Sequence, residues 1–301
     1  MHHALLLLPD FALILCGWLV CRYTALNRTV WQQVDSLVYY FLFPVLLFHS
    51  VVRSPLDPAS ASRLIAAGLL LAASAIALAW SVPRWPWVGR HIAARDHAAA
   101  AQVAFRFNSF VALAIIERLA GPPSALLLAV LIGVCVPVYN VAAVWPMARG
   151  SPGGVWRELA RNPLIIATVS GMAFNLLGLR LPVWLEPTTA RIAGTAIVLG
   201  LLAAGAGMRL SALAGKRALT AAVLAIRHLL SPLVAALLAR LLALDTAQAT
   251  ALLVFAAVPT AASSYVLAAR LGYDGAYVAG LVTLSTLLGM LSLPLALALA
   301  P

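Results

Sequence analysis

Long apolar runs recur along the whole chain, and each is about as long as a helix that crosses a lipid bilayer. About 20 apolar residues of helix are needed to span the hydrocarbon core. The ten runs have the approximate ranges 4–22, 31–52, 62–82, 97–120, 124–146, 163–180, 188–208, 218–240, 247–269 and 273–299. With 63% hydrophobic and 10% charged residues and a mean hydropathy of +1.00, the chain cannot cover a water-soluble globule. The sequence therefore predicts an all-α polytopic membrane protein with ten transmembrane helices.

The basic residues are placed as in membrane proteins, whose cytoplasmic loops carry an excess of Lys and Arg. The loops after odd-numbered runs hold twelve: Arg22, Arg28, Arg84, Arg90, Arg95, Arg149, Arg157, Arg161, Arg209, Lys216, Arg217 and Arg270. The opposite side holds six: Arg53, Arg63, Arg118, Arg180, Arg191 and Arg240. We therefore expect a protein of the cell (inner) membrane with both termini on the outer side. The net charge of +11 does not indicate nucleic-acid binding, because these residues stand singly or in pairs between apolar runs.

The ten runs divide at the longest loop, near residues 147–162, into halves 1–148 and 149–301. Five helices per half would make the second half an inverted copy of the first. Two faint internal matches agree: Pro9 and Gly17 with Pro163 and Gly171 at an offset of 154, and Asn108 and Gly121 with Pro259 and Gly272 at an offset of 151. Inverted repeats are typical of secondary transporters, which bind substrate near mid-membrane where broken helices meet.

Two polar residues, Arg106 and Asn108, interrupt the fourth run. A charged side chain at bilayer mid-depth costs at least about 2.5–3.5 kcal/mol, so it usually faces a cavity on a substrate or ion route. At 1.5 Å per residue from residue 97, Arg106 lies about 14 Å deep, and no acidic residue is predicted at that depth. An arginine without an acidic partner suits a carboxylate, so we expect a small organic acid as substrate. The alternative is that Arg106 binds carbonyl groups of a neighbouring helix.

The internal offset places Pro259, in the ninth run, opposite Asn108. Proline leaves the carbonyl of Phe255 without its helical donor and kinks the helix, and free backbone groups in a membrane are tolerated where they line a cavity. Thr260 and Ser263 would then border the site. The alternative is a tolerated kink with hydroxyls bonded back to their own helix.

The role of two further polar residues can be interpreted in two ways each. Asn140 could donate to a substrate carboxylate or join two helices. Arg227, nine residues into the eighth run, could be a ligand or could satisfy carbonyls freed by Pro232.

Five segments resemble the auxin efflux carrier family, including its bacterial malonate-permease-like members, in an order that covers essentially the whole chain. They are Phe105-Arg106-Phe107-Asn108-Ser109, Val138-Tyr139-Asn140, Asn162-Pro163-Leu164-Ile165-Ile166-Ala167, Val258-Pro259-Thr260-Ala261 and Leu284-Ser285-Thr286-Leu287-Leu288. The resemblance implies a ten-helix inverted-repeat permease in which interrupted helices four and nine cross, beside a transport domain that moves against a scaffold domain. The sequence departs from the family by lacking a proline near Asn108 in helix four.

The expected activity is secondary transport of small organic anions, with Asn108, Arg106, Asn140, Pro259, Thr260 and Ser263 at the substrate site. A sodium-coupled carrier like the bile-acid symporters, or a drug/metabolite-type carrier, is the alternative. Without a Gly-x-x-x-x-Gly-Lys motif or cysteines at metal spacing, we expect no ATP hydrolysis, cofactor or metal. An intramembrane enzyme such as a serine protease is disfavoured, because no Gly-x-Ser-Gly nucleophile segment occurs.

Energy coupling and assembly stay open at this stage. Asp10, Asp35 and Glu117 are candidates for proton coupling, and uniport driven by the membrane potential is the alternative, worth about 2.3 kcal/mol per charge per 100 mV. The identity of the acid, the direction of transport and the oligomeric state are not fixed by the sequence, and a homodimer is one alternative. The lipid bilayer and the organic acid are the expected partners.

Overall fold

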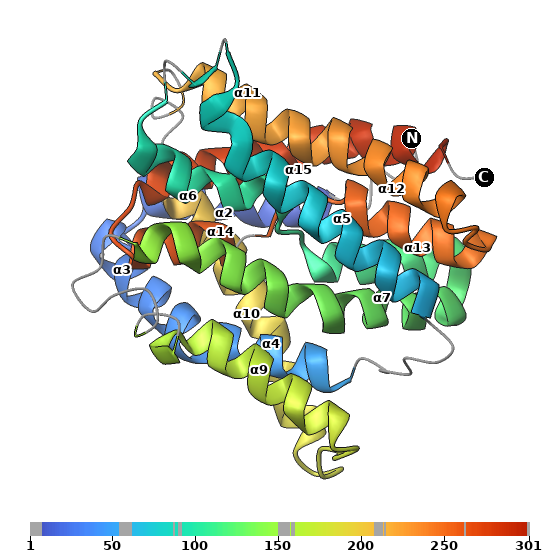
Figure 1. Cartoon of the computed structure of the whole chain (residues 1–301). Helices are drawn as coiled ribbons and strands as arrows, with labels where there is room; N and C mark the ends of the chain where they lie inside the picture. The colour runs from blue at the N-terminus through green and yellow to red at the C-terminus, as the bar shows by residue number, and fades with distance from the viewer. Residues whose placement is uncertain are drawn as a thin grey trace.

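The structure is a computed structural model that describes residues 8–53, 62–86, 88–89, 92–149, 157, 160–207, 213, 215–261 and 263–299. Within these ranges all regular elements are helices, and no strand occurs (Figure 1). The start of the first predicted run, the end of the seventh, most of the 147–162 loop, Arg90 and Arg209 lie outside the described residues.

The helices occupy every predicted apolar run. In chain order they are α2 (Leu8–Tyr23), α3 (Arg28–Leu37), η1 (Val38–Leu42), α4 (Phe43–Val52), α5 (Ser62–Ser81), η2 (Val82–Arg84), α6 (Ala94–Phe105), α7 (Ser109–Ala148), α9 (Pro163–Leu176), α10 (Glu186–Gly207), α11 (Arg217–Ala225), η5 (Ile226–Leu230), α12 (Ser231–Leu241), α13 (Thr246–Ala257), α14 (Ser263–Arg270) and α15 (Gly275–Leu297). Two of them, η1 and η5, are short π-helical segments inside longer helices. Each directly precedes a turn that contains a proline, Pro44 or Pro232, whose missing N–H disturbs the regular hydrogen-bond ladder.

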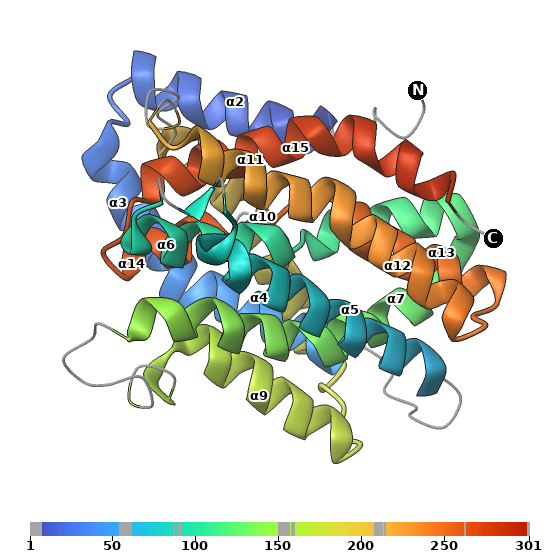
Figure 2. The ribbon, with the colours of Figure 1, turned by 45° about the horizontal axis from the view of Figure 1, so that its top comes forward.

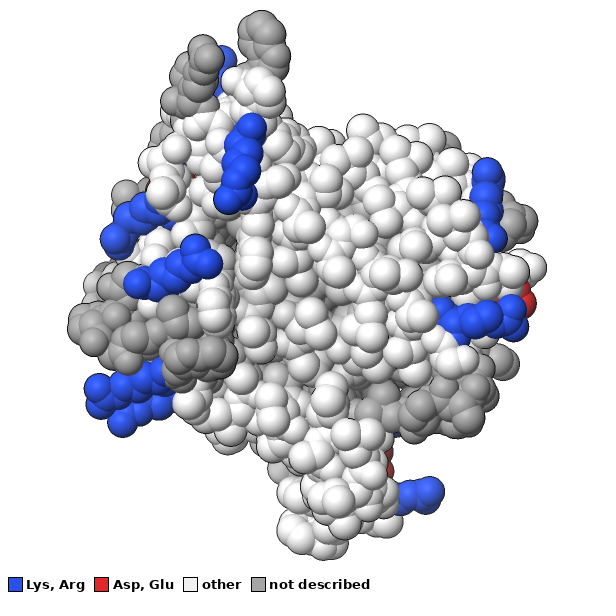
Figure 3. All heavy atoms as spheres, viewed as in Figure 1, with Lys and Arg blue, Asp and Glu red and all other residues white. Residues whose placement is uncertain are grey.

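The composition of the helices and the surface suit a bilayer. Among the described residues, five helices are long and apolar enough to cross a membrane: Ser62–Arg84, Leu127–Ala148, Glu186–Gly207, Arg217–Leu241 and Gly275–Leu297. Three shorter apolar helices accompany them, at Ala12–Tyr23, Pro163–Leu176 and Thr246–Ala257. On the face drawn in Figure 3, Lys and Arg gather at two opposite ends, and the wide band between them carries none. The chain is therefore a multi-pass membrane protein.

The long helix α7 reverses direction within its own length. A straight helix would separate residues 109 and 140 by about 47 Å. Instead, the Arg106 guanidinium, just before α7, donates to Asn140 Oδ1 at 3.2 Å, and the rings of Phe105 and Tyr139 stack with centroids 5.6 Å apart. The two predicted runs 97–120 and 124–146 are thus both present, but helical conformation continues through the expected turn at 121–123.

The helices form two groups. A first helix group contains α2, α3, α4, α9 and α10, in which α2 packs mainly on α10 and α9 mainly on α4 (Figures 1 and 2). A second helix group contains α5, α6, α7 and α11 to α15. Glycines let the pairs of the first group approach closely, as small residues do in membrane proteins. A Cβ on Gly17 would collide with the Leu202 carbonyl of α10, and one on Gly171 would press on the Phe48 backbone of α4.

Candidate functional site

Two helices of the second group end in the middle of the protein. α6 and α13 are both 12 residues long, and their first residues, Ala94 and Thr246, stand 152 positions apart. Each ends on an extended residue of nearly the same conformation: Arg106 has φ −70° and ψ 146°, and Val258 has φ −65° and ψ 155°. The chain resumes as α7 after the first break and as α14 after the second.

The two breaks meet. The Asn108 N–H donates to the Pro259 carbonyl at 2.9 Å, so the residues that the internal offset placed opposite one another are hydrogen-bonded. The first break occurs without a proline, so the absence of a proline near Asn108 does not keep this helix continuous. Its backbone is held by that bond and by Asn108 Oδ1, which accepts from the Val111 N–H at 3.3 Å and so caps α7. Asn108 is therefore a helix cap as well as a residue of the break.

Arg227 secures the second break. Pro259 supplies no N–H to the Phe255 carbonyl, and Arg227 Nη2 donates to that carbonyl at 3.0 Å instead. Arg227 Nε also donates to the Val258 carbonyl, at 2.8 Å, and Nη2 donates to it at 2.6 Å. Of the two readings of Arg227, the structural one matches these contacts, although its partners lie on α13 and not on its own helix near Pro232.

A second set of hydrogen bonds holds the segment after Pro259. The Thr260 N–H donates to Ser285 Oγ of α15 at 2.9 Å, and Ser285 Oγ lies 2.8 Å from His228 Nε2. The other ring nitrogen of His228 lies 2.8 Å from Ser292 Oγ. Neither Ser285 nor His228 was predicted at the site, because their role depends on packing between α15 and η5 that no local pattern reveals.

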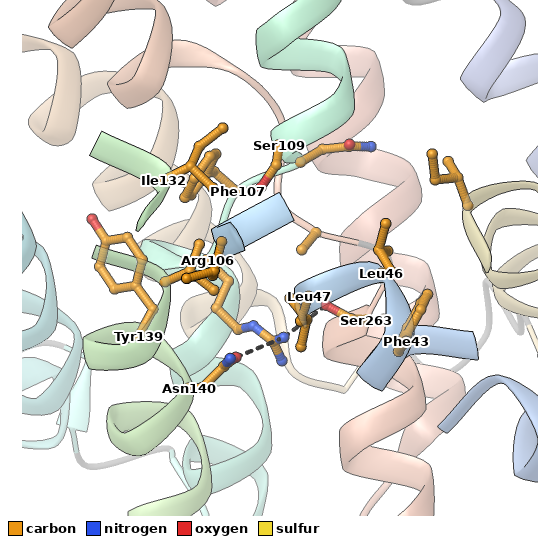
Figure 4. A pocket seen from close by; sticks show the side chains of 15 residues that line it. Phe43, Leu46, Leu47, Arg106, Phe107, Ser109, Ile132, Tyr139, Asn140 and Ser263 are labelled. Carbon is orange, nitrogen blue, oxygen red and sulfur yellow. Dashed lines mark hydrogen bonds between the residues drawn. The ribbon is translucent and has the colours of Figure 1, made fainter. Parts of the chain in front are cut away.

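Arg106 differs from Arg227 in the atoms that it reaches. Its side chain is buried, with 4% of the residue exposed, and it donates to side chains on three helices. Figure 4 shows the bonds to Asn140 and Ser263. The acceptors are Gln102 Oε1 at 3.0 Å, Asn140 Oδ1 at 3.2 Å and Ser263 Oγ at 2.7 Å. None of these partners carries a negative charge. The ion pairs of the described residues involve other cations: Arg53 with Glu186, and Lys216 with Asp96 and Asp274.

A small cavity of about 70 Å³ adjoins Arg106. Its walls come from both helix groups, so it lies between them. The lining residues are Phe43, Leu46, Leu47, Val51, Arg106, Phe107, Asn108, Ser109, Ile132, Val136, Tyr139, Asn140, Ile197, Ala261 and Ser263. Because α6 stops at Phe105, Arg106 and Asn108 both border this cavity, which a regular helix would prevent by turning them about 200° apart.

Several groups near the cavity can attract an anion, besides Arg106. The N-termini of α7 and α14 begin at Ser109 and Ser263, both in its wall, and helix N-termini attract anions. Asn140 is only 2% exposed, and its Nδ2 has no hydrogen-bond partner. Since Arg106 can only donate, Asn140 must present Oδ1 to it, which leaves Nδ2 as a buried donor without a partner. All of these groups favour a negatively charged ligand.

Four of the six predicted site residues line the cavity: Arg106, Asn108, Asn140 and Ser263. The other two, Pro259 and Thr260, lie in the second break but not in the cavity wall, and Thr260 is 1% exposed. Sequence reasoning missed Gln102, which holds Arg106, and the apolar wall from α4. The rings of Phe105, Phe107, Tyr139 and Phe255 form an aromatic cluster with neighbouring centroids 4.2–6.1 Å apart, and Phe107 and Tyr139 line the cavity.

Fold, apolar belt and buried polar cavity together define a multi-pass α-helical membrane protein. The family model of membrane transport proteins matches residues 145–297, about half of the chain, and the chain belongs to this family. This is the auxin efflux carrier and malonate-permease-like family that the sequence motifs indicate, a family of transporters rather than enzymes. A search of curated proteins found no match.

Proposed function

We propose that this protein is a secondary transporter that exports or exchanges small organic anions, such as mono- or dicarboxylates, by alternating access. The observation that carries the proposal is Arg106, a buried guanidinium in a cavity wall whose described partners are all uncharged. Burying a charge without an opposite charge is costly, and a carboxylate matches the planar fork of arginine. The substrate site is the cavity at the two breaks, with Arg106, Asn140 and Ser263 as donors.

The architecture that we propose is a pair of inverted five-helix repeats, residues 1–148 and 149–301. Three correspondences support it: the equal lengths of α6 and α13, the similar extended residues that end them, and their 152-residue spacing. The packing pairs correspond as well, since α2 packs on α10 through Gly17 and α9 packs on α4 through Gly171. Helices four and nine of the proposed ten are then α6 with the start of α7, and α13 with α14.

The mechanism follows from the position of the cavity between the helix groups. We expect the second helix group, which holds Arg106 and both breaks, to move against the first, which supplies the α4 and α10 walls. We also expect the end that bears Lys216, Arg217 and Arg270 to face the cytoplasm and both termini to lie outside, by the positive-inside rule. Labelling of single cysteines from either side of right-side-out membrane vesicles tests this orientation.

Transport by the purified protein in liposomes tests the function. Labelled mono- and dicarboxylates are supplied with and without sodium and pH gradients, for the wild type, Arg106→Gln and Asn108→Ala. Hydrogen bonds to charged groups are worth about 1.5–3 kcal/mol, so Arg106→Gln should lower kcat/KM roughly 10–100-fold. Arg53→Gln, which removes an exposed arginine, is the control and should leave transport unchanged.

Two results would count against the proposal. Normal transport by a well-folded Arg106→Gln protein would remove Arg106 from the site. Wild-type transport restricted to neutral or cationic compounds would exclude organic anions as substrates. A strict requirement for sodium would instead support the carrier type related to the bile-acid symporters.

A further inference from the structure

We infer that the cavity selects monocarboxylates with a short apolar tail over dicarboxylates. The inference rests on the proposed function and narrows its substrate class. It follows from the one charged residue of the described cavity wall and from the apolar residues that α4 and α10 contribute to that wall.

Arg106 is the one charged residue among the described residues of the cavity wall. Its guanidinium lies between Asn140 and Ser263 (Figure 4), 3.2 Å from the Asn140 Oδ1 and 2.7 Å from the Ser263 Oγ. The other polar residues of the wall, Asn108 and Ser109, are uncharged. One carboxylate placed against Arg106 would meet a full positive charge, which is enough to balance one negative charge.

Among the described residues, the first helix group contributes only apolar ones to the cavity wall. They are Phe43, Leu46, Leu47 and Val51 of α4 and Ile197 of α10. A methylene or methyl tail would be removed from water against this wall, which is favourable. A second carboxylate there would lose its hydration without gaining a cation or a hydrogen-bond donor, which is unfavourable.

The other buried arginine cannot supply the missing charge. Arg227 is 2% exposed and does not line the cavity. Its guanidinium is occupied by the Phe255 and Val258 carbonyls, which have no substitute donor when Pro259 interrupts the helix. The cavity therefore presents one formal positive charge to a ligand.

Three acids of similar length separate charge from size. Butyrate has one carboxylate and an apolar end, succinamate replaces that end by a neutral amide, and succinate replaces it by a second carboxylate. Equilibrium binding to the purified wild-type protein and uptake into proteoliposomes are measured for each at pH 7. We expect apparent affinity and kcat/KM to fall from butyrate to succinamate to succinate, with succinate at least about tenfold below butyrate. Succinate should improve as the pH is lowered, because protonation makes it a monoanion.

A charge added to the apolar wall should reverse the preference. Leu46→Lys adds a second cation to the cavity wall and should raise the ratio of succinate to butyrate uptake at least tenfold relative to the wild type. Leu46→Met, which keeps the wall apolar at similar length, should leave the ratio within about twofold. Size-exclusion profiles in detergent check that both variants fold. If Leu46→Lys does not fold, the comparison of the three acids on the wild type still tests the monocarboxylate preference.

The outcomes separate the inference from the proposed function. Succinate bound or carried as well as butyrate, with both lost in Arg106→Gln, would overturn the monocarboxylate preference and leave organic-anion transport intact. A second outcome is that none of the three acids binds or is transported, and that Arg106→Gln does not affect the compounds that the protein does transport. This outcome would overturn both the monocarboxylate preference and the proposed function. Butyrate preferred in the wild type, reversed by Leu46→Lys and not by Leu46→Met, would establish the inference.

Discussion

The half-helices α6 and α13 have the same length, end in the same conformation and meet at their breaks, yet they are held in different ways. The side chain of Asp245 caps the first turn of α13. At the other end of α13, Arg227 donates to the carbonyls of Phe255 and Val258. α6 begins without a side-chain cap and ends at Arg106, whose guanidinium reaches only side chains among the described contacts. The buried arginine near each end thus has a different task.

This difference separates framework from binding site. Backbone carbonyls are fixed acceptors that stay where the helix puts them, so Arg227 is committed to the fold. Side-chain acceptors such as Ser263 Oγ and Asn140 Oδ1 can rotate or exchange partners, so Arg106 can turn to a ligand without unfolding a helix. Two arginines that look alike in sequence, both nine residues into an apolar run, are distinguished by the atoms that they contact.

The largest expected effect is the loss of stability in Arg227→Met. The carbonyls of Phe255 and Val258 would lose their donors, and each unsatisfied buried group costs about 1–3 kcal/mol, which gives roughly 2–6 kcal/mol in all. Both this variant and the matched variant Arg106→Met remove a buried charge, but Arg106→Met leaves only side-chain acceptors unpaired. Because these acceptors can rotate to other partners, its stability should change by less than about 1 kcal/mol. Thermal unfolding in detergent, followed by tryptophan fluorescence, measures both.

Arg227→Lys is the control for charge alone. It keeps the positive charge but loses the fork that reaches two carbonyls, so its stability should lie between those of the wild type and Arg227→Met. Equal destabilisation by Arg106→Met and Arg227→Met would show that the two arginines do not have separate tasks.

A smaller effect is expected at Ser285, the acceptor for the Thr260 N–H. Ser285→Ala leaves that N–H buried without an acceptor and should destabilise the protein by about 1–2 kcal/mol. Ser292→Ala removes the other partner of His228 and leaves the break untouched, so it should cost less than half as much. If the two variants were equally destabilised, the effect of Ser285 would come from His228 and not from the break of α13.

The sequence was sufficient to predict features that depend on local chemistry or on a repeated spacing. Pro259 indicated a break because proline lacks an N–H wherever it stands, and the 151-residue offset placed that break against Asn108. The partner of Arg227 was not predictable, because it lies 28–31 positions away on α13 and depends on how η5 turns its side chain. The task of each arginine therefore became visible only in three dimensions.

The apolar residues of the cavity wall could not be predicted from the sequence either. Phe43, Leu46 and Ile197 are apolar residues in apolar runs, and nothing in their neighbours distinguishes a cavity wall from a lipid-facing surface. The turn at 121–123 was predicted as the gap between the apolar runs 97–120 and 124–146, and the chain does reverse, but helical conformation continues through it.

The smallest expected effect concerns the other end of α6, which lacks a side-chain cap. Lys216 Nζ lies 2.7 Å from Asp96 Oδ1 in the first turn of α6 and 2.8 Å from Asp274 Oδ2 at the start of α15. Burial alone would lower the pKa of Lys216, but its hydrogen bonds to Asp274 and Asp96 outweigh burial and raise that pKa above 10.5. Burial would raise the pKa of Asp274, but the hydrogen bond from Lys216 outweighs it and lowers that pKa below 3.8.

The pH window follows from these two shifts. The lowered pKa of Asp274 means that its contribution is present above its ordinary pKa of 3.8 and is lost as the pH falls below that value. The raised pKa of Lys216 means that its contribution is present below 10.5 and is lost at higher pH. Lys216→Met should therefore lower stability by a constant amount from about pH 5 to 9. The amount should be at most about 1 kcal/mol, because the cluster is partly exposed.

Thermal unfolding of the wild type and Lys216→Met across this range measures the difference, with Lys216→Arg as the charge-preserving control. The difference should shrink below about pH 4, where Asp274 becomes protonated. If it instead varied between pH 5 and 9, a group outside this cluster would control it. The start of α6 would then be held by contacts other than those of Lys216. The starts of α6 and α13 would differ more than the described ion pairs indicate, because α13 is capped by its own Asp245.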